Sequence, residues 1–138
     1  MGVRVRVSHI LDTCALLDLV SGRWNNPIAV KEMETAVHPV VLSLSGWEIA
    51  RKFQLGKLHL PCEPNGLNEF LDDVMNQYQL SWAVVNEKVA LGAETLPLHH
   101  KDPVDRMILS FAVLHQIPLV SSDRIFEMYG ITLLNHRK

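Results

Sequence analysis

Short apolar runs alternate with helical patterns along this 138-residue chain, and no other feature constrains its fold as strongly. Residues 40–44 form a nearly continuous apolar run, which is typical of a strand buried on both faces of a parallel sheet. Strands that alternate with helices predict right-handed crossovers and a mostly parallel central sheet covered on both faces. We therefore expect a three-layer α/β/α fold, with a helical hairpin at about residues 46–80 inserted at one edge. Strands are predicted at residues 3–11, 40–44, 82–85, 118–121 and 131–134, and helices at residues 13–20, 27–37, 45–55, 66–78, 86–96 and 102–115.

The size and composition of the chain fit one globular domain over residues 1–138. Hydrophobic residues make up 48% and charged residues 20%, close to the average of soluble proteins. The longest apolar stretch, residues 10–20, contains Asp12 and Asp18 and is shorter than a membrane span, so no membrane location is expected. The cysteines form no CxxC pair, and the start lacks the apolar region of a signal peptide, which predicts a cytoplasmic protein with reduced thiols.

Acidic residues cluster at the carboxyl ends of the predicted strands. Asp12 follows the first strand, and Asp123 follows the strand at residues 118–121. Glu48 lies in the first turn after the strand at residues 40–44, and Asp105 lies in the first turn of the helix 102–115. In an open parallel sheet, strand ends and the following helix N-termini meet at one edge, where ligands bind. We therefore expect these four carboxylates to lie together.

Each acid also has a local structural interpretation, which the sequence leaves open. Asp12 and Asp102 occupy N-cap positions, and Asp105 suits the positive end of its helix dipole. The spacing of Ser45 and Glu48 matches a capping box. Asp123 could start a turn with Arg124. These local roles account for each acid singly, but they do not explain why the acids converge on one edge of the sheet.

Clustered carboxylates raise one another's pKa, and divalent cations with oxygen ligands resolve this conflict. Mg²⁺ or Mn²⁺ at such a site suits phosphodiester hydrolysis, because the cation activates water and offsets charge at phosphorus. The formal charge of −2 lacks the basic excess of a duplex-binding domain, so nucleic-acid contact must be local or aided by the metal. The chain has no P-loop or GxGxxG motif, and the single Asp12 differs from the DxD pair of haloacid-dehalogenase-type phosphatases.

Five segments, in order, resemble the motifs of the PIN domain, and most closely its VapC-like branch, the toxin ribonucleases of bacterial toxin–antitoxin pairs. They are ILDTCALL (10–17), SLSGWEIA (43–50), LGKL (55–58), HHKDPVDRMI (99–108) and PLVSSDRIF (118–126), and the resemblance covers residues 8–135. It implies a PIN-like fold and a Mg²⁺- or Mn²⁺-dependent endoribonuclease. By this resemblance Asp12 and Asp105 are the firmest metal ligands, and Glu48 and Asp123 complete the site as further catalytic and metal-site acids.

The resemblance also implies supporting residues and partners. Thr13 and Ser121 are expected to orient ligands by hydrogen bonds, with helix capping as the alternative. Asp102 belongs to the same Asp-Pro-x-Asp-Arg motif as Asp105 and is a supporting residue. The expected partners are a structured RNA (a tRNA or rRNA), a cognate antitoxin and a second copy of the chain. Phosphate contacts are predicted for Lys101, Arg106 and Arg124, with paired surface charges as the alternative.

Two other functions stay open from the residues alone. A catalytically silent PIN-like module would act through protein or RNA complexes, and a phosphatase or phosphoacceptor domain would be phosphorylated on Asp12. Trp47 is expected in the core. The adjacent His99 and His100 are expected to point apart, which argues against a zinc site there.

Overall fold

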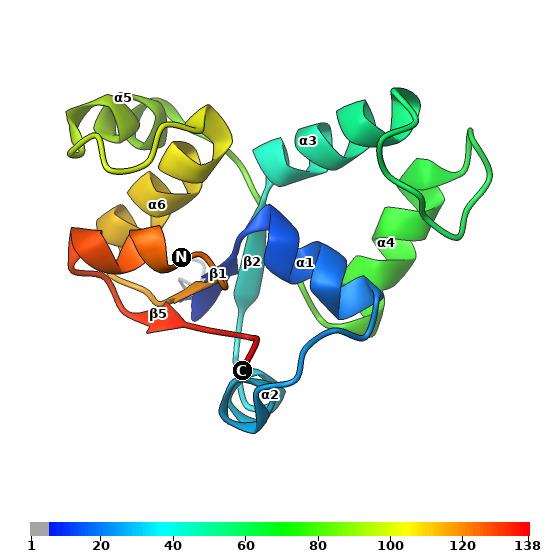
Figure 1. The fold of residues 1–138 in the computed structure, drawn as a ribbon, viewed down its shortest axis with the longest axis horizontal. Coiled ribbons are helices and arrows are strands. Elements are labelled where there is room, and N and C mark those ends of the chain that lie inside the picture. The colour runs from blue at the N-terminus through cyan, green and yellow to red at the C-terminus, as the bar shows by residue number, and fades with distance from the viewer. Residues whose placement is uncertain (1–5) are drawn as a thin grey trace, which may run out of the picture.

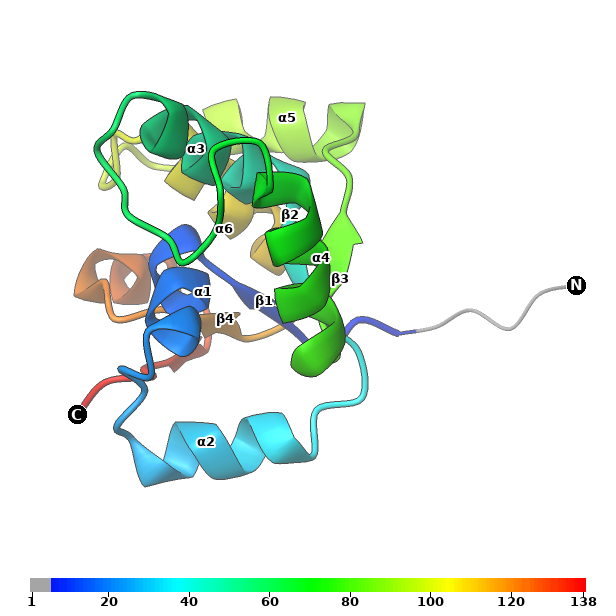
Figure 2. The same ribbon diagram turned by 90° about the vertical axis from the view of Figure 1, so that its right-hand side faces the viewer.

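The computed structural model describes residues 6–138 as a parallel sheet with helices on both faces (Figures 1 and 2). The five strands have the order β3-β2-β1-β4-β5, and all four neighbouring pairs are parallel. The strands are β1 (His9–Leu11), β2 (Pro39–Leu42), β3 (Ser81–Ala83), β4 (Leu119–Val120) and β5 (Leu133–Leu134). The helices are α1 (Thr13–Val20), α2 (Pro27–Glu34), α3 (Ser43–Gln54), α4 (Leu67–Gln77), α5 (Glu87–Thr95) and α6 (Pro103–His115), with the 3-10 helix η1 at Arg124–Tyr129. The predicted α/β/α architecture is confirmed, including the pair of helices between β2 and β3.

Alternate residues of the central strands face two separate hydrophobic cores, as the pleat of a strand requires. Ile10 of β1 and Leu119 of β4 pack with α5, α6 and η1 in one core. Leu11 and Val120, the next residues along, pack with α1, α3 and α4 in the other. Figure 1 shows the same division, with α1, α3 and α4 to one side of the strands and α5 and α6 to the other. The sheet is therefore the middle layer of three.

Several element boundaries differ from the prediction. Strand β1 covers only His9–Leu11, and the predicted strand residues 3–5 lie outside the described residues. Helix α2 ends at Glu34, and β3 ends at Ala83. Among the described residues no helix is long and apolar enough to cross a membrane.

Helix α3 begins at Ser43, two residues earlier than predicted, so the expected capping box is wrong. Ser45 is buried inside the first turn, and the N-cap position is Leu42, which has no side-chain cap. Ser45 and Ile49, four residues apart, form the buried face of α3. Trp47 lies midway between them and points outward with 55% exposure, so its expected core position is also wrong.

The C-terminal segment is fastened to the connection between α1 and α2. Two backbone amides, of Asn25 and Asn26, donate to the His136 carbonyl at 3.1 and 3.3 Å. Asp18 of α1 accepts from His136 Nε2 at 2.8 Å and from Arg137 Nη2 at 2.6 Å. Burial raises the pKa of Asp18, but hydrogen bonds from Arg137 and His136 outweigh it and leave the pKa below its ordinary value.

Candidate metal site

The candidate site lies at the carboxyl ends of β1 and β4, which are neighbours at the centre of the sheet. The pairing of Leu11 with Val120 brings the next residues, Asp12 and Ser121, side by side. The Ser121 hydroxyl donates to Asp12 Oδ2 and accepts from the backbone amide of Asp123 at 3.0 Å. One buried serine therefore links the first acid to the last, as its predicted supporting position requires.

Asp12 caps α1, as one of its two expected roles requires. Its Oδ1 accepts from the amide of Ala15 at 2.7 Å and so caps α1, while Oδ2 faces Ser121. The side chain is buried, with the residue only 4% exposed. Burial raises the pKa of Asp12, and the hydrogen bonds from Ser121 and Ala15 only partly offset this effect. The carboxylate is thus held rigidly where its charge is poorly solvated.

Asp105 lies in the first turn of α6, above the N-cap residue Asp102. Asp102 Oδ1 accepts from the Asp105 amide at 3.1 Å, so its predicted capping role is confirmed. The pKa of Asp105 is raised to about 7, first by burial and then by the charge of Asp102. His100 lowers this pKa, whereas the negative charges of Asp12 and Glu48 raise it further. The acids predicted to converge therefore act on one another electrostatically.

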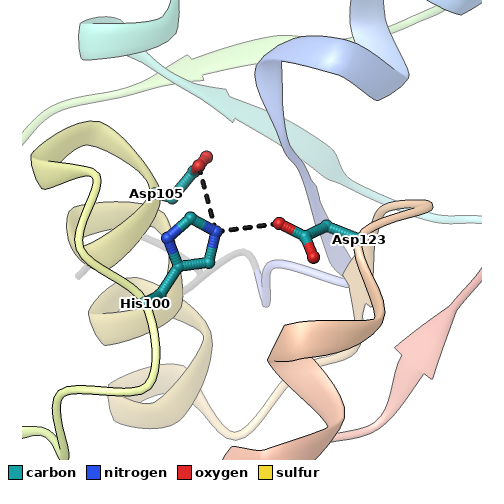
Figure 3. A group of neighbouring side chains, drawn as sticks. All are labelled: His100, Asp105 and Asp123. Carbon is teal, nitrogen blue, oxygen red and sulfur yellow. Dashed lines mark hydrogen bonds and ion pairs between the residues drawn. The ribbon is translucent and has the colours of Figure 1, made fainter.

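A buried imidazole lies between two of these acids (Figure 3). His100 Nε2 is 2.8 Å from Asp123 Oδ2 and 3.2 Å from Asp105 Oδ2. The three ligand atoms lie within 4.8 Å of one another. The expectation that His99 and His100 point apart holds, since His99 is exposed against Tyr129 while His100 faces the acids. Sequence reasoning missed His100 as a site residue, although its place just before the Asp102 cap was a usable signal.

Arg106 is not at the rim of the site, which corrects its prediction as an RNA contact. The residue is 5% exposed. Its guanidinium donates to four backbone carbonyls at the end of α5 and in the loop before α6, those of Ala93, Leu96, Pro97 and His100. Four of its five N–H donors are engaged in this way, so the side chain fastens the loop that carries His100.

The other predicted residues surround this centre at different distances. Glu48 of α3 pairs with Lys52 at 3.6 Å and lies outside the group formed by His100, Asp105 and Asp123. Thr13 donates to Ser45 at 2.9 Å and joins the starts of α1 and α3. The two remaining candidates for phosphate contact are exposed and adjoin site residues in sequence: Lys101 and Arg124.

A free thiol also adjoins the carboxylates. Cys14 lies two residues after Asp12 in α1 and forms no disulfide. Partial burial raises the pKa of Cys14 to about 11, and the negative charges of Asp12 and Asp105 add to this rise. The Cys14 thiol therefore reports on the charge of the site.

The donor set fits a divalent cation. Asp105 and Asp123 lie with His100 in one group of ligand atoms, and Asp12, which is outside that group, is linked to Asp123 through Ser121. Burial raises the pKa of Asp12 and of Asp105, so a negative charge on either carboxylate is poorly solvated, and a bound cation would offset it. Carboxylates are ligands that Mg²⁺ and Mn²⁺ prefer.

Comparisons with known proteins identify the family of the chain. Residues 9–131 match the PIN domain family, and the chain belongs to that family. No curated protein matches the sequence.

The fold is similar to solved chains from toxin–antitoxin complexes. A chain of DNA-bound VapBC from Salmonella typhimurium has a TM-score of 0.70 and 16% identity, over 94% of this chain and 98% of that one. A chain of VapBC2 from Rickettsia felis, bound to a promoter DNA fragment, has a TM-score of 0.69 and 14% identity, over 94% and 98%. A chain of a toxin–antitoxin complex from Klebsiella pneumoniae has a TM-score of 0.65 and 14% identity, over 95% and 99%.

Proposed function

We propose that this chain is a metal-dependent endoribonuclease and the toxin of a toxin–antitoxin pair. The observation that carries the proposal is the convergence of Asp12, Asp105 and Asp123 at the carboxyl edge of the sheet, with pKa values of two of them raised. Membership of the PIN domain family and similarity to chains of toxin–antitoxin complexes support it.

In the proposed mechanism some residues of the chain bind the cation and others order water. Asp12 and Asp105 hold a divalent cation, Mg²⁺ or Mn²⁺, and Ser121 fixes the carboxylate of Asp12. The cation supplies Lewis acidity, which makes water a stronger nucleophile and offsets negative charge at the phosphorus. Asp123 and Glu48 complete the negative charge of the site and order water by accepting its hydrogen bonds.

The proposed substrate is a structured RNA, a tRNA or an rRNA loop. The chain's formal charge of −2 favours local over extended phosphate contact. Lys101 and Arg124 are exposed beside the site and are the proposed phosphate contacts. The proposed partners are a cognate antitoxin and a second copy of the chain, in the cytoplasm.

Cleavage of RNA tests the proposal directly. The purified chain is incubated with total bacterial RNA in Mg²⁺, in Mn²⁺ or in EDTA, and the new 5′ ends are sequenced. We expect discrete cuts that require the cation and disappear in Asp105→Asn. Asp73→Asn is the matched control, because Asp73 is an exposed acid on α4, and it should cut like the wild type.

Two results would overturn the nuclease. Cuts that persist in EDTA or in Asp105→Asn would come from a contaminant. An absence of cuts by protein that binds the cation would favour the catalytically silent binding module, and capture of a small antitoxin-like partner would then be the next measurement.

A further inference from the structure

We propose that His100, which lies between Asp105 and Asp123, is a nitrogen ligand of the cation at this site, so that the site prefers Mn²⁺ and similar transition ions to Mg²⁺. The inference rests on the proposed function only in requiring that a divalent cation binds at this site. It extends the site beyond the acids that sequence reasoning selected, to a side chain of a different chemical kind.

The distances from His100 Nε2 to the two carboxylates are those of neighbouring ligands. Donors at adjacent corners of an octahedral shell with bonds of about 2.1 Å lie about 3 Å apart. His100 Nε2 is 2.8 Å from Asp123 Oδ2 and 3.2 Å from Asp105 Oδ2, on either side of that value. A cation that contacts both carboxylates would therefore lie beside Nε2.

The His100 ring is held in place by contacts on three sides. It stacks on Phe126 with centroids 5.1 Å apart and an interplanar angle of 24°. The backbone amide donates to the Tyr129 hydroxyl at 2.8 Å, and the carbonyl accepts from buried Arg106 at 3.0 Å. Because both the ring and its backbone are fixed, the imidazole stays at the site when a cation arrives. Such preorganisation is what a ligand requires.

The protonation of the ring is compatible with ligation. Nε2 can bind a cation only when the remaining proton is on Nδ1. The Asp102 amide donates to Nδ1 at 3.4 Å, well beyond the usual 2.9–3.0 Å, so the hydrogen bond that would keep Nδ1 unprotonated is weak. Cation binding displaces the proton from Nε2, as it does at other imidazole sites. The competing interpretation is that Nε2–H stays and donates to Asp123.

The identity of the third donor sets the expected ion preference. Mg²⁺ is a hard cation that prefers oxygen ligands and keeps several waters. Imidazole nitrogen suits first-row transition ions, and its contribution follows their general order of affinity. Two carboxylates and one imidazole therefore favour Mn²⁺ over Mg²⁺ more strongly than the acids alone would.

Spectroscopy of bound Mn²⁺ tests the inference without measuring RNA cleavage. Mn²⁺ is added to metal-free protein below one equivalent, and free Mn²⁺ is followed by electron paramagnetic resonance, with Mg²⁺ as competitor. Electron spin echo modulation then detects ¹⁴N directly bound to the ion. We expect ¹⁴N modulation in the wild type and in His99→Gln, the exposed neighbour, and none in His100→Gln or His100→Ala. Both His100 variants should lose Mn²⁺ affinity by about ten-fold or more while Mg²⁺ affinity changes far less.

The outcomes separate this inference from the proposed function. Bound Mn²⁺ without ¹⁴N modulation in the wild type would overturn the His100 ligand and leave the nuclease intact. Unchanged Mn²⁺ affinity in His100→Gln and His100→Ala would overturn it equally, provided that thermal unfolding in EDTA shows both variants folded. Failure of the wild type to bind Mn²⁺ or Mg²⁺ would overturn both proposals.

Discussion

Replacing Arg106 with methionine should destabilise the fold by a large fraction of its total stability. Methionine retains most of the apolar stem but removes a guanidinium that donates to four backbone carbonyls. A net contribution of about 1 kcal/mol for each hydrogen bond gives a loss of about 4 kcal/mol. Domains have a free energy of unfolding of only about 5–15 kcal/mol, so the loss should be easy to measure.

Urea unfolding followed by circular dichroism measures this loss. The midpoint should fall while the slope with urea stays constant, which shows that stability and not compactness has changed. Arg106→Lys keeps the charge but supplies fewer donors in a different geometry, so we expect an intermediate loss. Arg23→Met, at an exposed arginine, is the matched control and should stay within about 0.5 kcal/mol of the wild type.

The reasoning would be refuted if Arg106→Met stayed within about 1 kcal/mol of the wild type. It would also be refuted if Arg106→Lys kept full stability but lowered the salt dependence of RNA binding, since that result assigns the guanidinium to phosphate.

Three further predictions follow from the charged groups. Because the pKa of Asp105 is raised to about 7, the metal-free protein should lose stability as pH rises from about 4 to 7. Asp105→Asn should remove this loss and raise the urea midpoint in EDTA at pH 8. An unchanged midpoint would contradict the prediction. Mg²⁺ or Mn²⁺ should cancel the carboxylate charges that raise the pKa of Cys14. The reaction of Cys14 with a disulfide reagent at pH 8, measured in a Cys62→Ser background, should therefore become faster on cation binding. An unaltered rate with the cation bound would argue against proximity of Cys14 to the carboxylates. The pKa of Asp18 is lowered, so its contribution to stability is present above about pH 4 and is lost as pH falls through the lowered pKa. Asp18→Asn should therefore destabilise the protein at pH 7 and much less at pH 3. The urea midpoints of the variant and the wild type should converge at the acid end of a pH series.

The fold was predictable because its determinants are local and periodic. The apolar runs identified the five strands of the described residues, and the caps Asp12 and Asp102 marked where two helices begin. The carboxyl-edge rule then predicted that the acids lie at one edge of the sheet, and it required no knowledge of side-chain positions. These inferences needed only the chain order and the hand of the crossovers.

The errors occur where a side chain's partner comes from elsewhere in the fold. Ser45 matches a cap by spacing, but it lies inside α3 and accepts a hydrogen bond from Thr13. Arg106 looks like a surface charge in a basic and acidic motif, yet its partners are carbonyls that converge only after α5 and α6 pack. His100 gives no periodic signal, because its contacts with Asp123 and Phe126 span more than twenty residues.

The loop before α6 is held mainly through hydrogen bonds to its main-chain atoms, so the side chains at its exposed positions are free to vary. Arg106 holds the carbonyls of Pro97 and His100, while the Tyr129 hydroxyl accepts from the amides of His99 and His100. Neither anchor depends on which side chains the loop carries at its exposed positions 98, 99 and 101. Substitutions there can therefore change the surface beside the acids while the imidazole of His100 keeps its position. Relatives with different targets could diverge at these three positions without rebuilding the centre.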